Sequence, residues 1–597
     1  MPAKPYPNRE NGRPHGPSSG PLPGEPELIA ITHPTAALRA RATGPASLAG
    51  ADVGPLAEAL AASGAVMKPL FGPSEDHLNL REAVAGMAPL VNAEGMSRYY
   101  KVECPEEKME ELAAKLRALP VIAAAYVKPA ALPAVELNTM LPAVEDVPSV
   151  TPDFSGQQGY LGAAPGGVEA THSWTVPGGA GAGVRIIDVE GAWRYTHEDL
   201  TQNQGGVVGG TESTDIGWRN HGTAVMGEIG GDRNGFGITG ISPDANFRSI
   251  SIFGGMGSAG AIRRAADLLS PGDIILIELH RPGPLATGVG QQGFIAIEWW
   301  PDDYDAIRYA ISRGIVVVEA AGNGAQDLDN PAYDQPAPGF PAGWSNPFRR
   351  GARDSGAILV GAGAPPPGTH GANHGPDRSR LDFSNYGAAV DAQGWGREVT
   401  TCGYGDLQGG GNEDLWYTNQ FSGTSSASPI LVGSIACIQG VRRARSLTPL
   451  TATEVRALLR STGSPQTDAP GRPATQRIGN RPNIREMIAR VAPVQTLTVP
   501  LHRYWNPLVG DHFYTTNWSE LGNGRGGWRY EGVQCHVYPL RLPGTVPLYR
   551  YWNPTLGDHF YTTSFAELGH GARGWGYEGI QCYVRSGPGT GATALYR

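Results

Sequence analysis

A serine at the start of a predicted buried helix constrains this chain more than any other feature. The segment is Gly423-Thr424-Ser425-Ser426-Ala427-Ser428-Pro429, and apolar residues follow it at roughly helical spacing. Pro429 is tolerated because first-turn amides have no helical acceptor to lose. The helix dipole and the free amides favour negative charge there. Ser425 is therefore either a helix N-cap or, if an imidazole reaches its hydroxyl, a nucleophile.

Two further segments supply the partners that a nucleophilic serine needs. The apolar run at residues 183–191 predicts a buried parallel strand with Asp188 at its carboxyl end, where open α/β sheets place their sites. A polar turn around His221 leads into a helix of small residues. Taken alone, Asp188 could cap a strand end and His221 could lie on the surface. Together with Ser425 they give the chain order Asp-His-Ser.

In these motifs the chain resembles the subtilisin-like serine proteases over roughly residues 150–490. A fourth match is a predicted strand that ends in Ala320-Ala321-Gly322-Asn323. The resemblance implies an α/β fold with a subtilisin-like three-layer doubly wound parallel sheet. It implies a serine endopeptidase that works through an acyl-enzyme and needs no cofactor for its chemistry. The residues implied are the triad Asp188, His221 and Ser425, with Asn323 in the oxyanion hole.

The predicted substrate-binding segment departs from the resembled pattern. Residues 273–283 align with the strand that lines the primary specificity pocket, where the family usually has Ser-Leu-Gly-Gly. Glu278 could bias the site toward basic or polar substrate residues; alternatively, the side chains here turn away from the substrate. Two smaller departures are an additional charge at Glu190 and an alanine at position 224. The implied substrate-binding residues are Glu278, Leu279, His280, Ala320, Ala321 and Gly322.

The region before the predicted catalytic domain has its own organisation. Residues 98–128 predict a strand, a helix and a second apolar strand. This unit resembles the inhibitor propeptide of the same proteases, which implies a zymogen with an intramolecular inhibitor. Residues 129–150 would then hold the processing site; alternatively, the unit is a helper domain that is never removed. We expect a leader and propeptide over 1–148 and a catalytic domain over 149–492.

The C-terminal region, residues 493–597, contains a tandem repeat. Residues 501–535 recur as 548–582, and Leu595-Tyr596-Arg597 begins a third unit at the same spacing of 47. Short aromatic strands predict a small all-β module that the last strand closes against the first repeat. Such modules resemble tails of bacterial secreted hydrolases. We expect either polysaccharide or cell-wall binding through exposed aromatic rings, or a structural or protein-binding tail.

Composition and charge narrow the function classes. The net charge is −9 without a long acidic or basic run, which argues against nucleic-acid partners, and no apolar run suggests a membrane span. The N-terminus lacks the apolar segment of a Sec signal peptide. We therefore expect a protein that is exported to the cell envelope or the outside by another route, or one that stays in the cytoplasm. We also expect a monomer. Five cysteines leave at least one unpaired; Cys402 and Cys437 could pair, or Cys437 could be a core residue.

The sequence also allows two other functions and a structural metal ion. The protease fold could be an inactive peptide-binding scaffold, or the tail could carry the main role as a wall-binding protein. The resemblance also allows a structural calcium ion, whose ligands the sequence does not assign. Asp327 and Asp329 are candidates, and a solvated acidic loop is the alternative.

Overall fold

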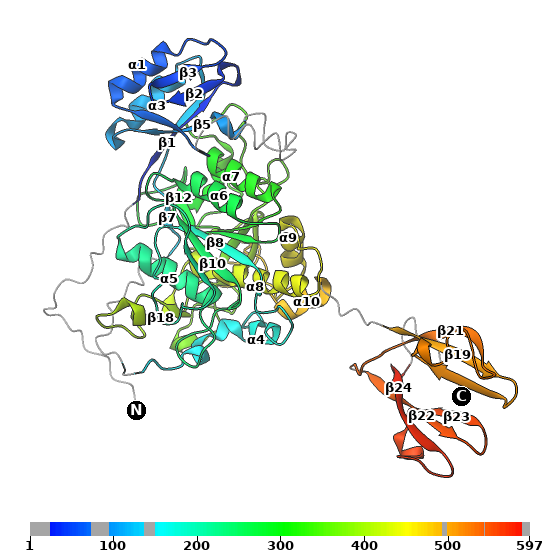
Figure 1. Cartoon of the computed structure of the whole chain (residues 1–597). Coiled ribbons are helices and arrows are strands. Elements are labelled where there is room, and N and C mark those ends of the chain that lie inside the picture. Colours follow the sequence, from blue (N-terminus) through cyan, green and yellow to red (C-terminus); the bar gives the residue numbers. More distant parts are fainter. Residues whose placement is uncertain are drawn as a thin grey trace, which may run out of the picture. The chain divides into compact units, whose positions relative to one another are not determined.

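The chain folds into two units, which are described separately. The computed structural model describes residues 24–72, 95–135, 148, 150–491, 498–542 and 544–587. Contacts divide the chain into Met1–Ala492, which holds the leader and an α/β domain, and Pro493–Arg597, which is all-β (Figure 1). The predicted third-repeat strand at 595–597 and most of the predicted processing linker lie outside the described residues.

The leader is an antiparallel sheet with helices packed on it. Its strand order is β4-β5-β1-β6, and apolar residues of β1 and α3 share one core cluster. The predicted strand, helix and strand are confirmed as β5, α3 and β6. The elements are β1 (Glu27–Thr32), β2 (Leu38–Arg41), β3 (Gly44–Ser47), α1 (Gly54–Ser63), β4 (Val66–Pro69), β5 (Tyr99–Glu103), α3 (Met109–Arg117) and β6 (Ile122–Lys128).

The α/β domain is built on a seven-stranded parallel sheet of order β16-β15-β14-β11-β8-β10-β9. Buried β-branched runs form its central strands, as both faces are covered. Its strands are β8 (Arg185–Glu190), β9 (Gln204–Val207), β10 (Asn246–Ser251), β11 (Ile274–Ile277), β14 (Val316–Ala320), β15 (Ile358–Gly363) and β16 (Val390–Trp395). This is the predicted subtilisin-like fold.

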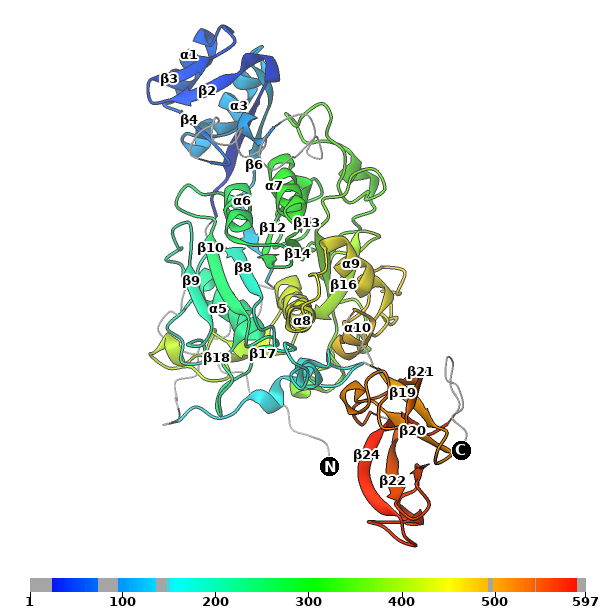
Figure 2. The same ribbon diagram turned by 45° about the vertical axis from the view of Figure 1, so that its right-hand side comes forward.

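Helices cover both faces of this sheet, which makes three layers (Figure 2). Alternate strand residues separate the two cores: Ile186 packs with α5 and α8, and Ile187 packs with α6 and α7. The leader adds apolar side chains to the second core. The helices are α4 (Ala170–Ser173), α5 (Ile216–Gly230), α6 (Ser258–Leu268), α7 (Pro301–Ser312), α8 (Thr424–Ala444), α9 (Ala452–Ser461) and α10 (Ile484–Val491).

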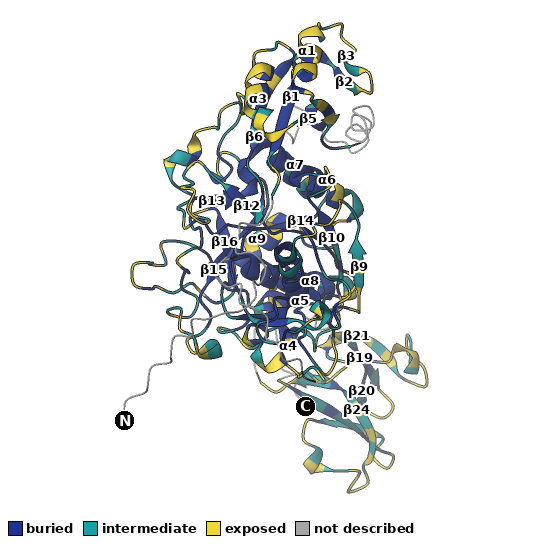
Figure 3. Cartoon of the chain, turned by 90° about the vertical axis from the view of Figure 1, so that its left-hand side faces the viewer, coloured by how far each residue is buried: buried dark blue, intermediate teal, exposed yellow. Residues whose placement is uncertain are grey.

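The predicted helix after Ser425 is α8, the most deeply buried helix of the sheet domain (Figure 3). By length and composition alone it could also cross a membrane. Its whole apolar window is buried inside the protein, and a core position accounts for that composition.

Short antiparallel strands extend the sheet domain on the side of the predicted site. The order β13-β12-β7 joins β12 (Leu279–Pro282) and β13 (Phe294–Ala296) to β7 (Leu132–Pro133), which comes from the end of the leader. A second pair is β17 (Val399–Cys402) with β18 (Tyr417–Phe421). Cys402 and Cys437 are both buried and unpaired, so the disulfide alternative does not hold and Cys437 is a core residue.

The second unit contains two matching three-stranded sheets, of order β20-β19-β21 and β23-β22-β24. In each sheet the central strand pairs with its two neighbours in the same antiparallel register, for example Tyr504 with Phe513 and Tyr551 with Phe560. The strands are β19 (Val499–Asn506), β20 (Asp511–Thr515), β21 (Arg529–Val537), β22 (Thr545–Asn553), β23 (Asp558–Thr562) and β24 (Gly576–Arg585).

Candidate active site

Ser425 lies in the first turn of α8 and is fully buried. Gly423 just before it has a φ of 108°, a conformation that L side chains rarely adopt. A Cβ at this glycine would also collide with the carbonyl oxygen of Ala134. The turn therefore brings the free amides at the start of α8 against a segment of the leader, and the Ser425 N–H donates to the Ala134 carbonyl at 3.2 Å.

His221 lies in α5, whose first turn is capped by the Asp215 carboxylate. Its Nδ1 lies 2.8 Å from Oε2 of Glu190, the last residue of β8. The prediction that Asp188 holds this imidazole is therefore corrected, because Glu190 makes the contact. The physical reason is register: side chains two positions apart share one face of a strand, and only the one at the strand end reaches the edge where α5 begins.

Asp188 lies behind Glu190 rather than against the imidazole. Its Oδ2 accepts a hydrogen bond from Trp193 Nε1 at 2.8 Å. Burial raises its pKa well above the usual range, and the neighbouring Glu190 raises it further. Burial likewise raises the pKa of Glu190, against a hydrogen bond with Asp188 that lowers it. Two buried carboxyl groups in contact cannot both ionise cheaply, so they share one proton. The sequence signal was the pair of acids itself, of which the second precedes Gly191.

The His221 ring is sealed from solvent together with the serine. Burial lowers the pKa of His221 to about 3. Its Nε2 and the Ser425 hydroxyl are both buried without a hydrogen-bond partner among the described residues. A neutral imidazole and a serine hydroxyl that no other group engages are what a general base and its nucleophile require.

Asn323 follows β14 and is placed by hydrogen bonds to its side chain and its backbone. Its Oδ1 accepts from the Thr424 N–H at 2.9 Å, and its own N–H donates to His280 Nδ1 at 3.2 Å. Its Nδ2 donates to Gln291 at 3.1 Å. The carboxamide therefore lies beside the first turn of α8, the predicted neighbourhood for an oxyanion-hole amide, with its donor held by Gln291.

Leader residues 131–135 lie along the strand predicted to bind substrate. Register partners are Leu279 with Pro133 and His280 with Leu132, so these two predicted substrate-binding residues meet the segment through their backbone. The Ala134 N–H donates to the Glu278 carbonyl at 3.4 Å. Together with the bond from Ser425, this holds both sides of Ala134 in an extended conformation, with Val135 buried next to it.

The Glu278 side chain turns away from this segment. Its Oε1 accepts from the Ser428 hydroxyl at 2.6 Å, beneath the first turn of α8. Burial raises its pKa well above the usual range, the Asp188 carboxylate adds to the rise, and the hydrogen bond from Ser428 opposes it. Glu228 is a further buried carboxyl whose pKa is raised by burial and by Glu278. Of the two alternatives for Glu278, the structure therefore agrees with the one in which the side chain turns away from the substrate.

The other predicted residues lie around the serine without contributing charge. Ala320 ends β14, and the Ala321 N–H pairs with the neighbouring strand. The Gly322 N–H donates to Thr424 Oγ1 at 3.2 Å. All three are buried, and these bonds fix the position of Asn323.

The candidate calcium ligands are used by the loop itself. An Asp327 oxygen accepts from the Asp329 N–H, and an Asp329 oxygen accepts from the Ala388 N–H. Arg349 forms an ion pair with Asp329 at 3.7 Å. Among the described residues there is no group of three or more His, Cys, Asp or Glu side chains that could hold a metal ion. These residues therefore do not fit a calcium site.

Comparison with known proteins gives matches to the sheet domain and to the tail. Residues 167–480, just over half of the chain, match the family model described as Subtilase family. Residues 480–585 match a domain of unknown function, DUF5648. An alkaline protease of Alkalihalobacillus alcalophilus is 27% identical over 56% of this chain and 73% of its own length. Thermitase of Thermoactinomyces vulgaris is 27% identical over 52% and 90%, respectively.

Solved structures give weaker matches. A protease of Pseudoalteromonas arctica is 20% identical over 57% of this chain and 99% of its own, with a TM-score of 0.39. The epidermin leader peptide processing serine protease of Staphylococcus aureus is 15% identical over 78% and 99%, with a TM-score of 0.45.

Proposed function

Because the chain belongs to the subtilase family and is a serine-type endopeptidase, we propose that its chemistry resides in Ser425, His221 and Glu190. The contact between Glu190 and His221 Nδ1 is the observation that carries this assignment. His221 Nε2 takes the Ser425 proton as the hydroxyl oxygen attacks the scissile carbonyl. Ionised Glu190 holds the imidazole tautomer and stabilises the imidazolium that forms.

The remaining steps follow from the donors around the serine. The developing oxyanion accepts hydrogen bonds from the Ser425 N–H and from Asn323 Nδ2. To donate to it, Asn323 Nδ2 gives up its hydrogen bond to Gln291. His221 then returns its proton to the leaving amine, and the acyl group remains on Ser425. Water, deprotonated by His221, hydrolyses this acyl-enzyme. Asp188 shares its proton with Glu190 on the side that faces away from His221. The two carboxyl groups then carry one negative charge together rather than two.

We further propose that the protein is a zymogen whose leader occupies its own cleft. The Ala134 carbonyl accepts from the Ser425 amide, which is where the carbonyl of a bond to be cleaved belongs. The Ala134–Val135 peptide bond is therefore our candidate for the processing site, in place of an unspecified bond in residues 129–150. Cleavage there leaves Val135 as the new N-terminus and the leader as a bound product.

Charged side chains hold the leader on the catalytic domain. Lys128 of β6 is fully buried and pairs with Asp302 at 2.5 Å and with Asp303 at 3.3 Å. Both aspartates lie in the first turn of α7, where the helix dipole favours negative charge. Glu27 of β1 lies 3.1 Å from the same ammonium. Since breaking such a buried network is costly, the leader is expected to stay bound after cleavage as an inhibitor.

The experiment compares the parent chain with Ser425→Ala and Val135→Pro. We expect the parent to convert to a form whose N-terminal residue is Val135, and Ser425→Ala to remain intact. Val135→Pro turns the bond after Ala134 into a tertiary amide without an N–H, so processing should slow. Val135→Ile, a conservative change, is the control. A parent that stays intact and is not labelled at Ser425 by a fluorophosphonate would support the inactive scaffold. A different new N-terminus would refute the proposed bond.

The C-terminal tail carries an exposed aromatic ring that a sugar could contact. We propose that Trp518, which is 40% exposed and packs against His502 and Tyr530, offers a ring face to a polysaccharide. Retention of the Ser425→Ala chain on insoluble cell-wall polysaccharide should fall for Trp518→Ala and not for Leu508→Ala. We propose peptide or protein substrates and action outside the cytoplasm on the family assignment, and a monomeric state as a separate expectation. Fractionation of producing cells tests the location.

A further inference from the structure

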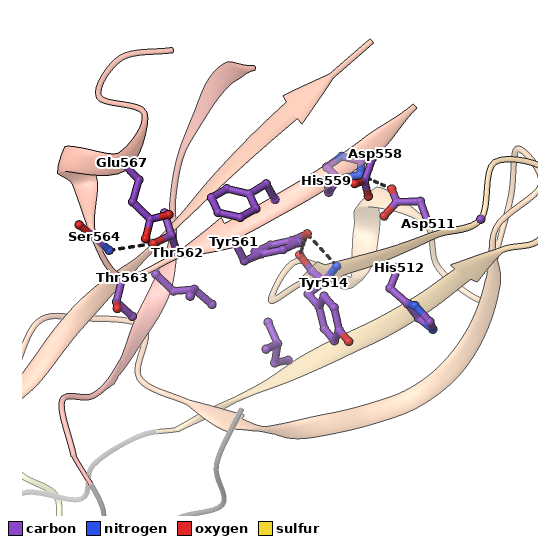
Figure 4. Close-up of a pocket in the computed structure, with 14 residues that line it drawn as sticks. Asp511, His512, Tyr514, Asp558, His559, Tyr561, Thr562, Thr563, Ser564 and Glu567 are labelled. Atoms are coloured by element: carbon purple, nitrogen blue, oxygen red, sulfur yellow. Dashed lines mark hydrogen bonds and ion pairs between the residues drawn. The ribbon is translucent and has the colours of Figure 1, made fainter. Parts of the chain in front are cut away.

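A pocket of about 550 Å³ lies between the two repeats of the tail (Figure 4). Polar contacts between two pairs of residues join the repeats at its edge. Asp511 pairs with His559 at 2.7 Å, and the Tyr514 N–H donates to the Tyr561 hydroxyl at 2.8 Å. The pocket is lined, among others, by Leu501, Leu548, Asp558, Phe560, Thr563 and Glu567. It therefore combines an apolar side with carboxylates and an aromatic ring.

The contact between the first and second repeats shows what such a surface binds. Arg550 of β22 reaches across to the first repeat, where Nη1 lies 3.4 Å from a Glu520 oxygen. Its guanidinium lies over the Phe513 ring, 4.9 Å from the centroid. Gln581 of β24 donates to Thr516 Oγ1 at 3.1 Å. The first repeat thus offers a ring, a hydroxyl and a carboxylate, and the second repeat fills this surface with an arginine.

The same surface recurs on the second repeat. Positions 47 residues after Phe513, Thr516 and Glu520 are Phe560, Thr563 and Glu567. All three line the pocket. The pocket is thus the repeat equivalent of the surface on which Arg550 sits.

The sequence contains a matching segment at the matching distance. Leu595-Tyr596-Arg597 stands 47 positions after Leu548-Tyr549-Arg550, and Gly591 likewise stands 47 positions after Gly544. The connection from β24 is therefore as long as the one by which β21 leads into β22. We propose that the pocket is the docking site of residues 595–597, with the Arg597 guanidinium over Phe560 and paired with Glu567.

The chemistry of the pocket favours this occupant. A guanidinium on an aromatic face beside a carboxylate gains both a cation–π contact and an ion pair. Burial and the nearby Asp511 raise the pKa of Asp558, which indicates crowded carboxyl groups that a cation would relieve. Leu501 and Leu548, the repeat equivalents of Leu595, both line the apolar side of the pocket. The pocket thus offers the proposed occupant an apolar contact for Leu595 and an aromatic ring and a carboxylate for Arg597.

A charge exchange in the full-length Ser425→Ala chain tests this pairing. We expect amide hydrogen exchange at residues 595–597 and 558–564 to be slow in the parent. Arg597→Glu and Glu567→Arg should each speed exchange at both segments by about tenfold or more, and the double exchange should restore protection. Arg541→Glu, an exposed arginine of the same unit, is the matched control and should leave both segments unchanged.

A peptide experiment identifies the occupant directly. A chain that lacks residues 588–597 should bind a synthetic peptide of that sequence, and the peptide with glutamine in place of its arginine should bind at least about tenfold more weakly. Three outcomes would overturn the proposal. These are fast exchange of residues 595–597 in the parent, no peptide binding, and a parent dimer that Arg597→Glu dissociates, since the last would place a second copy's segment in the pocket.

Discussion

Glu190 lies against His221, with its Oε2 2.8 Å from the imidazole Nδ1, and Asp188 stands one pleat behind it. The two acids share a face of β8 but have different neighbours. Glu190 meets the imidazole, and Asp188 meets the Trp193 indole at 2.8 Å. The pair therefore has one member in contact with the base and one that supports it through a shared proton.

This arrangement predicts unequal effects for two isosteric substitutions. Glu190→Gln should slow self-cleavage by about 10³- to 10⁴-fold, because the neutral amide neither stabilises the imidazolium nor fixes its tautomer. Asp188→Asn keeps its hydrogen bond from Trp193 and should slow self-cleavage by about tenfold at most. The rate of appearance of the new N-terminus in full-length chains measures both. Equal losses, or a larger loss for Asp188→Asn, would return the role to Asp188.

Lys128 allows a test of how firmly the leader is held. Burial lowers its pKa, but Asp302, Asp303 and Glu27 raise it by more, so the ammonium is charged. In the Ser425→Ala chain, Lys128→Met leaves Asp302 without its cation and leaves Asp303 and Glu27 to Arg281, at 3.7 and 3.2 Å. It should lower the free energy of unfolding of the leader by about 3–5 kcal/mol. Lys115→Met breaks only an exposed pair with Glu111, which water screens, and should leave the stability of the leader nearly unchanged. Urea unfolding measures both; a Lys128 effect no larger than the control would contradict the buried network.

Some of these features follow from local sequence patterns, and others depend on contacts between distant residues. The strand before the acids, the helix after Ser425 and the leader's strand–helix–strand unit follow from local apolar periodicity, and they were predicted correctly. The choice between Asp188 and Glu190 was not local. It depends on how far β8 extends before α5 approaches, which only the packed sheet settles. The Glu278 side chain is similar, because its partner Ser428 lies 150 positions away. The Ala134 contact required the leader and catalytic domain to be docked.

Glu278 gives a third prediction, on charge beneath the nucleophile. Since burial raises its pKa well above the usual range, we expect a protonated carboxyl, which Glu278→Gln mimics closely. We expect self-cleavage of Glu278→Gln within about threefold of the parent. Glu278→Ala should instead destabilise the Ser425→Ala chain by about 2–4 kcal/mol, through the buried cavity that it leaves and the loss of the hydrogen bond from Ser428.

The same pair of variants decides the specificity hypothesis. A peptide-library profile that Glu278→Gln leaves unchanged would exclude a role for this charge in selecting basic residues. A loss of self-cleavage above about 100-fold in Glu278→Gln would show that the ionised carboxylate is needed, and would contradict the protonated state.

His280 gives a prediction on acid stability. Its Nδ1 accepts from the Asn323 N–H, its ring packs on Phe294 at 4.8 Å, and burial lowers its pKa to about 3. The folded state thus disfavours a proton that the unfolded chain accepts below about pH 6.5. The stability from neutral His280 is present above that pH and is lost as pH falls toward 3. Each pH unit below 6.5 costs about 1.4 kcal/mol, or about 3 kcal/mol by pH 4.

The measurement is a comparison of slopes, which removes the constant cost of the substitution. His280→Asn keeps an oxygen acceptor for the Asn323 N–H but cannot bind a proton. Both chains carry Ser425→Ala. Between pH 7 and pH 4 the free energy of unfolding should fall by about 3 kcal/mol less in His280→Asn than in the parent. His33→Asn, at an exposed histidine of the leader, is the control for the exchange of an imidazole for an amide. Parallel curves for all three chains would mean that His280 titrates alike in the folded and unfolded states, and that the site beneath Asn323 admits water.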